Sequence, residues 1–142
     1  MSFLNTLPLS IGKTTFFISE FTALDRLHDL EYTVDQPEEE APGESASNKE
    51  KMAYGLRREQ IILDQVSHSI ALSLAHHHRS EDNNVHEYAH VLELQNTVKA
   101  QWPNRKVNEA YELLKKLNDP NFEPDEDSEP QEPQEPPTPE KS

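Results

Sequence analysis

Residues 49–74, KEKMAYGLRREQIILDQVSHSIALSL, form the longest stretch of helical periodicity in the chain. Apolar side chains recur there every three or four residues, which is the spacing of one helix face. The members of this face are Leu56, Leu63, Val66, Ile70 and Leu74, widened by Ile62, Ala71 and Leu72. So broad a face predicts a central helix, the most buried element, that neighbours contact on two sides. An oligomer contact is the alternative.

A second amphipathic helix is expected before this one, from about Ser19 to Val34. Ser19 is the expected cap, because its hydroxyl can accept a backbone N–H two or three residues further on. Between the two helices, residues 35–49 (DQPEEEAPGESASNK) predict a flexible acidic loop. The apolar stripe of the helix is expected to face the core and comprises Ala23, Leu24, Leu27, Leu30 and Val34.

Two further helices are expected after the central one, which the polar residues Arg79 to Asn84 would end. Pro103 ends the third helix, because proline disfavours helical geometry in the residue before it, and the last helix opens at Pro103 or Asn104. The stripe of the third helix comprises Val85, Tyr88, Leu92, Gln95, Val98 and Trp102. That of the last helix comprises Val107, Ala110, Tyr111, Leu114 and Leu117.

The amino-terminal segment predicts a β-hairpin. FLNTLPLS at residues 3–10 and KTTFFIS at residues 13–19 resemble short strands separated by Ile11 and Gly12. Gly12 can supply the positive φ of a tight turn, and Pro8 restricts the first strand to an edge. A hairpin alone is marginally stable and must lie against helices. We therefore expect a mainly α fold, with about four helices and a short N-terminal hairpin, in a domain of residues 1–117.

Residues 118–142 are expected to form a disordered acidic tail. They hold seven of the eleven prolines, and nine acidic residues accompany a single base, Lys141. Proline interrupts helices and strand ladders, and Phe122 is almost the only apolar side chain available for burial.

Composition narrows the classes of function. The 142 residues allow one domain, and 27 acidic against 13 basic residues give a formal charge of −14, which disfavours binding to nucleic acid or anionic membranes. The chain has no cysteine, and no apolar run approaches the roughly 20 residues of a membrane-spanning helix. We expect a soluble, unsecreted protein whose fold depends on packing.

HEYAH, at residues 86–90, matches the HExxH signature of zinc peptidases. Histidines four apart share a helix face and could bind Zn²⁺, while Glu87 could activate a bound water. A third ligand is missing from the extended signature, and only Glu109 or Glu112 could replace it. A polar helix face is the favoured interpretation, and a metallopeptidase is the alternative.

Other chemistry finds no support in the sequence. The histidines at 76–78 can interact with the carbonyl end of the long helix, or bind Zn²⁺ or Ni²⁺ adventitiously together with those of HEYAH. The three glycines are too widely spaced for a phosphate loop, and no GxSxG elbow occurs. We expect no enzymatic activity, no catalytic residue, no metal and no cofactor.

Three blocks resemble the tail assembly chaperones of lambda-like phages, the minor tail protein G family: ISEFTALDRLHDL at 18–30, ALSLAHHH at 71–78, and QWP at 101–103 before EAYELLKKL at 109–117. Their order and spacing are similar to those of the family, as is the acidic, proline-containing tail. HEYAH has no counterpart there, which weakens the peptidase alternative.

The resemblance implies a function in the host cytoplasm, with absence from the mature virion. Such a protein binds the tape measure protein, keeps it soluble and helps recruit major tail subunits. Ribosomal frameshifting near the end of the reading frame appends a second domain that contacts the major tail protein. The acidic tail would then keep the assembly soluble by repulsion, or connect the domain to this extension.

Large apolar side chains on the helices are the expected contacts with a partner. The candidates are Leu74, Trp102 and Tyr111, although Trp102 is also a candidate for the core. Self-association stays an open alternative. The alternative function is that of a small acidic phage adaptor or regulatory protein with another protein partner.

Overall fold

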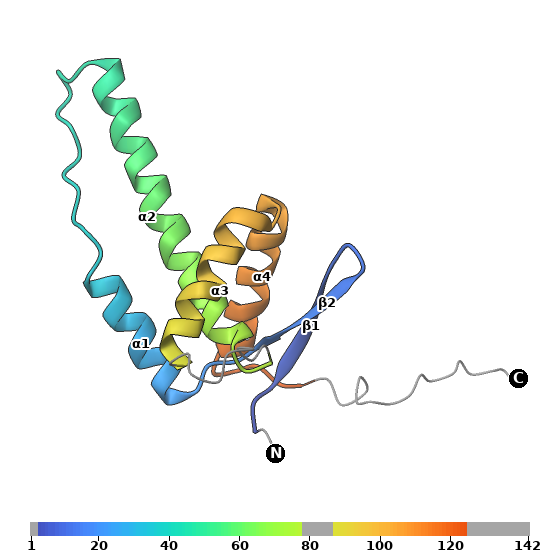
Figure 1. Ribbon diagram of the computed structural model, residues 1–142. Coiled ribbons are helices and arrows are strands. Elements are labelled where there is room, and N and C mark those ends of the chain that lie inside the picture. The colour runs from blue at the N-terminus through green and yellow to red at the C-terminus, as the bar shows by residue number, and fades with distance from the viewer. Residues whose placement is uncertain (1–2, 78–86, 125–142) are drawn as a thin grey trace, which may run out of the picture.

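The computed structural model describes residues 3–77 and 87–124, which form a hairpin followed by four helices (Figure 1). The elements are β1 (Thr6–Ile11), β2 (Thr14–Ser19), α1 (Ala23–Val34), α2 (Asn48–Leu74), α3 (Glu87–Gln101) and α4 (Asn104–Asn118). The prediction of a mainly α fold with an amino-terminal hairpin is confirmed. The first residues of the expected tail are described: α4 runs to Asn118, and Phe122 packs against the core. The expected break at Arg79 to Asn84, Val85 of the predicted third stripe and residues 125–142 of the expected tail lie outside the described residues.

The hairpin turns at Gly12, as predicted. Strands β1 and β2 are antiparallel, with Leu9 opposite Phe16, and Gly12 adopts a φ of 60°, which costs a residue without Cβ little. Pro8 lies in β1, where a two-stranded sheet offers only edges. Leu9 and Ile18 are fully buried against the helices, so the hairpin belongs to the core.

Helix α1 begins later than predicted, because Thr22 rather than Ser19 caps it. The Thr22 Oγ1 accepts the Asp25 N–H at 3.0 Å, and the Asp25 carboxylate accepts the Thr22 N–H at 2.9 Å. This reciprocal capping box satisfies two backbone donors at once. Ser19 instead ends β2, where its N–H donates to the Ser73 Oγ at 2.6 Å and its carbonyl accepts from the same hydroxyl at 2.8 Å.

Helix α2 is buried only in its carboxy-terminal half. Its buried residues all lie between Ile61 and Leu74, whereas Met52 and Leu56 are 74% and 60% exposed. Length explains the difference: at a rise of 1.5 Å per residue, the 27 residues of α2 span about 40 Å, and the 15 residues of α3 or α4 span about 22 Å. The expectation of burial along the whole central helix was therefore wrong for its first half, which extends beyond α3 and α4 (Figure 1).

Helices α3 and α4 complete the core around the second half of α2. The α4 stripe is confirmed, since Val107, Ala110, Leu114 and Leu117 are buried, and the helix follows Pro103 as predicted. In α3 the predicted stripe is wrong at one position, because Leu92 is 38% exposed and Val91 is buried instead. Val91, Gln95 and Val98 form the buried face of α3 at i, i+4 and i+7. No helix among residues 3–77 and 87–124 combines the length and apolarity needed to cross a membrane.

Candidate protein-binding surface

Helix α1 turns its apolar stripe away from the core. Leu24, Leu27, Leu30 and Val34 are 60%, 51%, 49% and 80% exposed. The prediction that this stripe faces the core is wrong. Figure 1 shows α1 at the periphery of the helices, with the linker rising from its end.

The opposite face of α1 is polar and explains this orientation. The Asp29 carboxylate accepts hydrogen bonds from the Ser69 hydroxyl at 2.8 and 3.0 Å and lies 2.8 Å from the His68 Nδ1. Because a carboxylate only accepts, His68 Nδ1 carries the proton of that bond. His68 is fully buried, so both of its ring nitrogens need partners.

Tyr88 and Tyr32 complete the surroundings of His68. The Tyr88 hydroxyl lies 2.6 Å from the His68 Nε2, and the Tyr32 ring stacks on the imidazole with centroids 4.0 Å apart and planes 7° apart. The Tyr32 hydroxyl accepts the Gln95 amide N–H at 2.9 Å. This polar network joins α1 to both α2 and α3.

A second polar pair fixes the amino-terminal end of α1. The Asp25 carboxylate lies 2.7 Å from the His76 Nε2. Burial by itself would raise the pKa of the Asp25 carboxyl, but hydrogen bonds from His76 and Thr22 outweigh burial and lower that pKa below 3.8. The hydrogen bond to Asp25 raises the pKa of His76 above 6.5, against the opposing effect of burial. His76 thus ties the end of α2 to the start of α1.

The geometry of α1 follows from these polar contacts. At 100° per residue, Ala23, Leu27, Leu30 and Val34 lie within about 60° of one another on the side opposite Asp25 and Tyr32. Leu24 and Arg26 flank this group on opposite sides. We call Leu24, Leu27, Leu30 and Val34 the α1 stripe. An apolar helix face that the rest of the described chain leaves uncovered is the kind of surface that binds another polypeptide.

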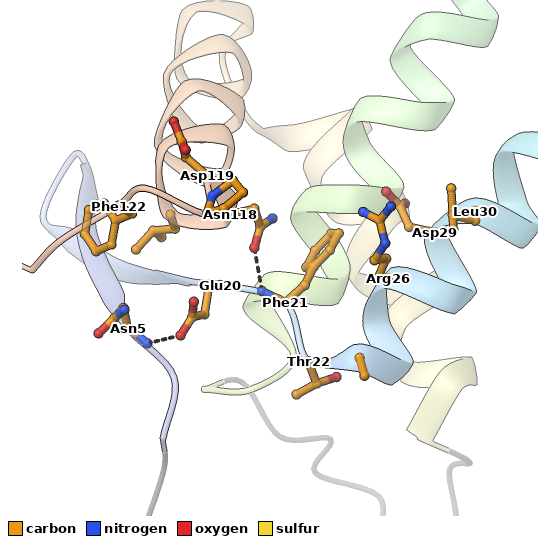
Figure 2. A pocket seen from close by; sticks show the side chains of 13 residues that line it. Asn5, Glu20, Phe21, Thr22, Arg26, Asp29, Leu30, Asn118, Asp119 and Phe122 are labelled. Carbon is orange, nitrogen blue, oxygen red and sulfur yellow. Dashed lines mark hydrogen bonds between the residues drawn. The ribbon is translucent and has the colours of Figure 1, made fainter.

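A pocket of about 440 Å³ borders the α1 stripe between α1 and the end of α4 (Figure 2). Leu30 belongs to both the stripe and the pocket wall, so the two features are continuous. The Asn118 side chain closes one side by accepting the Phe21 N–H at 2.8 Å, and Glu20 accepts the Asn5 N–H at 2.9 Å. Hydrogen bonds between distant segments therefore fix the walls of the pocket relative to one another.

The three residues expected to contact a partner lie elsewhere. Leu74 is 2% exposed in the core and lacks the open surface expected of it. Trp102 is half-buried, packs on Phe16 with ring centroids 5.0 Å apart, and lines a shallow pocket of about 230 Å³ with Leu74. Tyr111 is half-buried under the Lys115 ammonium, 5.2 Å from the ring centroid. Contact through Trp102 or Tyr111 stays a prediction.

The α1 stripe was missed as a site, although one signal for it stands in the sequence. Asp25, His28, Asp29 and Tyr32 occupy the opposite face at i, i+3, i+4 and i+7, and the long helix carries Ser67, His68 and Ser69 within its apolar half. Buried polar side chains need hydrogen-bond partners, and the polar face of α1 can provide them for Ser67, His68 and Ser69 only if this face packs against the long helix. The apolar stripe on the other side of α1 would then be exposed.

The HEYAH motif is described only from Glu87 to His90. Glu87 is exposed, the Tyr88 hydroxyl bonds to His68, and His90 lies 3.5 Å from Glu93; His86 is outside the described residues. Over residues 3–77 and 87–124, no three His, Cys, Asp or Glu side chains gather as metal ligands.

The family model described as "Bacteriophage lambda tail assembly chaperone, TAC, protein G" matches residues 2–136. No curated protein and no solved structure shows significant similarity to the chain.

Proposed function

Since the chain belongs to the bacteriophage lambda tail assembly chaperone family, we propose that it acts in tail assembly by binding the tape measure protein and keeping it soluble. Binding is stoichiometric, helix against helix, and many copies cover the length of one tape measure protein. The family is not an enzyme class, and the proposed action makes and breaks no covalent bond.

The exposed α1 stripe is the observation that carries this proposal. A long helical protein that has not yet been enclosed by a tail tube exposes apolar helix faces, which aggregate in water. The α1 stripe offers a rigid apolar face of matching periodicity, because two polar clusters fix α1 on α2 and α3. Covering an apolar face of the partner with α1 would leave the acidic surface of the chaperone in contact with water.

Three finer proposals follow from the family. A frameshift-extended form recruits major tail subunits through its appended domain. Residues 1–117 act as the folded chaperone domain, while residues 118–142 keep the crowded assembly soluble or connect the extension. The protein acts in the host cytoplasm and leaves before the virion is complete.

Co-expression with the tape measure protein of the same phage tests the proposal. We expect the tape measure protein to move from the insoluble to the soluble fraction and to co-purify with the full-length chain at a ratio of several copies to one. An unrelated acidic protein of similar charge, expressed in place of the chain, is the control. A tape measure protein that stays insoluble, or that never co-purifies, would count against the function.

A further inference from the structure

We infer that the partner segment seated on α1 is a basic amphipathic helix, whose leucine-type side chains cover the α1 stripe and whose Lys or Arg residues meet the linker and the pocket beside α1. This inference rests on the proposed function and specifies the chemistry of the partner.

The first argument is the shape of the α1 stripe. Its exposed members follow one another at intervals of three, three and four residues, from Leu24 to Val34. A second helix with the same periodicity packs against such a row by fitting its side chains between the turns. An extended peptide presents the side chains of one face about 6.6 Å apart and matches the spacing of about 4.5–6 Å along this row less well.

The second argument is the charge around the carboxy-terminal end of the stripe. Residues 31–44 contain six acidic residues and no lysine or arginine. Only Glu39 has a salt bridge in the described part of the chain, to the Arg57 Nε at 2.6 Å. The other five are exposed: Glu31, Asp35, Glu38, Glu40 and Glu44. A helix with lysines on its flanks would be attracted by this charge, and one with glutamates would be repelled.

The third argument is the chemistry of the pocket between α1 and α4. Phe21, Leu30, Leu117 and Phe122 provide apolar wall, while the carboxylates of Glu20, Asp29 and Asp119 outnumber the single guanidinium, that of Arg26. Figure 2 shows Arg26 and Asp29 on one side of the pocket, and Glu20 and Asp119 on the other. A long basic side chain fits such a site, because its methylene stem can cover apolar wall while its charged head stays near the carboxylates and water.

A second copy of this chain is a poorer occupant. Two chains, each with a formal charge of −14, repel each other. Self-pairing along α1 would also oppose two identical stripes, and α1 carries a single lysine or arginine, Arg26, to meet the five exposed acids of residues 31–44.

Three synthetic helical peptides of about 18 residues, long enough to span α1 at 1.5 Å per residue, are suitable probes. The first has a leucine stripe flanked by lysines, the second has the same stripe flanked by glutamates, and the third has the composition of the first in scrambled order. Fluorescence anisotropy with the full-length chain measures their affinities. We expect the lysine peptide to bind at least about tenfold more tightly than either of the others.

Variants of the chain locate the binding site. Leu27→Asp should weaken binding of the lysine peptide at least about tenfold, while Leu92→Asp, a matched change on α3, should leave it within about twofold. Glu38→Lys with Glu40→Lys should weaken the lysine peptide and strengthen the glutamate peptide. Circular dichroism melting verifies that each variant is folded. Equal binding of the lysine and scrambled peptides, or full binding by Leu27→Asp, would overturn the inference.

The tape measure protein separates the inference from the function on which it rests. If the unmodified chain solubilises it and Leu27→Asp does not, both stand. If both chains solubilise it equally, the function stands and the α1 site is wrong; if neither does, the function itself fails. Sedimentation that shows a dimer of the unmodified chain, dissociated by Leu27→Asp, would assign the stripe to a second copy instead and overturn the inference.

Discussion

Helix α4 packs its apolar stripe into the core, whereas helix α1, with a stripe of the same spacing, leaves it exposed. Val107, Ala110, Leu114 and Leu117 are at most 4% exposed. The α1 stripe, by contrast, is about half exposed or more at every position. The two helices therefore have similar apolar periodicity, and they differ in the contacts that their opposite, polar faces make.

The polar faces account for the difference. The face of α4 opposite its stripe carries charged residues that are well solvated, such as Glu112 and Lys115, which pair with each other at the surface at 3.0 Å. The corresponding face of α1 carries Asp29, whose partner His68 lies on α2, and Asp25, whose partner His76 lies in the turn just after α2. A buried polar network is stable only when each member is satisfied, so α1 can dock in this orientation and α4 cannot.

The largest expected effect is the difference in stability between truncating the α4 stripe and truncating the α1 stripe. Leu114→Ala in α4 should lower the free energy of unfolding by about 2–5 kcal/mol, because it leaves a cavity in the core. Leu27→Ala in α1 should change it by no more than about 0.5 kcal/mol, because the side chain is half exposed. Urea unfolding followed by circular dichroism measures both. Equal costs for the two substitutions would show that α1 is buried in solution.

The next effect concerns the polar side of α1. His68→Ala should lower the free energy of unfolding by about 1–3 kcal/mol, because it removes the partner of both Asp29 and Tyr88 from a buried site. Hydrogen exchange should accelerate in α1 more than in α4. His77→Ala, at an exposed position in the turn just after α2, is the control. Unchanged exchange in α1 would contradict a network that holds this helix.

The sequence predicted the elements better than it predicted their orientation. The hairpin with its turn at Gly12, the restart after Pro103 and the α4 stripe are decided locally, by backbone preference and a single apolar period. The end of α1 at Val34 and the acidic segment after it were also predicted.

The errors arose where the orientation of a helix depends on contacts with residues far away in the sequence. An apolar stripe shows where a helix divides into two faces, but the core can satisfy either face when a neighbour supplies matching hydrogen bonds. Asp29 needs His68 and Ser69, which are 39 and 40 residues away, and no local rule reveals that pairing. Ser19 was the expected cap of α1, but the residue three positions after it is Thr22, whereas Thr22 has an acidic residue, Asp25, three positions later to complete a capping box.

A smaller effect is expected at the capping box of α1. Thr22→Ala should lower the free energy of unfolding by about 1 kcal/mol, because the Asp25 N–H loses its hydroxyl acceptor and the capping box keeps only one of its two hydrogen bonds. Thr22→Ser keeps the hydroxyl and should restore most of that stability. A thermal melt of the three proteins measures the difference. An alanine variant as stable as the unmodified chain would show that the start of α1 is held by the Asp25–His76 pair alone.

The smallest effect is the pH dependence of the Asp25–His76 pair, worth at most about 1 kcal/mol because both side chains are partly exposed. His76 has a raised pKa, so its contribution is complete below pH 6.5 and is lost as the pH rises through the pKa of the folded state. Asp25 has a lowered pKa, so its contribution is complete above pH 3.8 and is lost as the pH falls through the pKa of the folded state. A double-mutant cycle with Asp25→Asn and His76→Gln should therefore give a larger coupling energy at pH 5.5 than at pH 9. Coupling that grows toward pH 9 would contradict an ionic attraction between α1 and the turn after α2, and would leave hydrogen bonding alone to orient the α1 stripe outward.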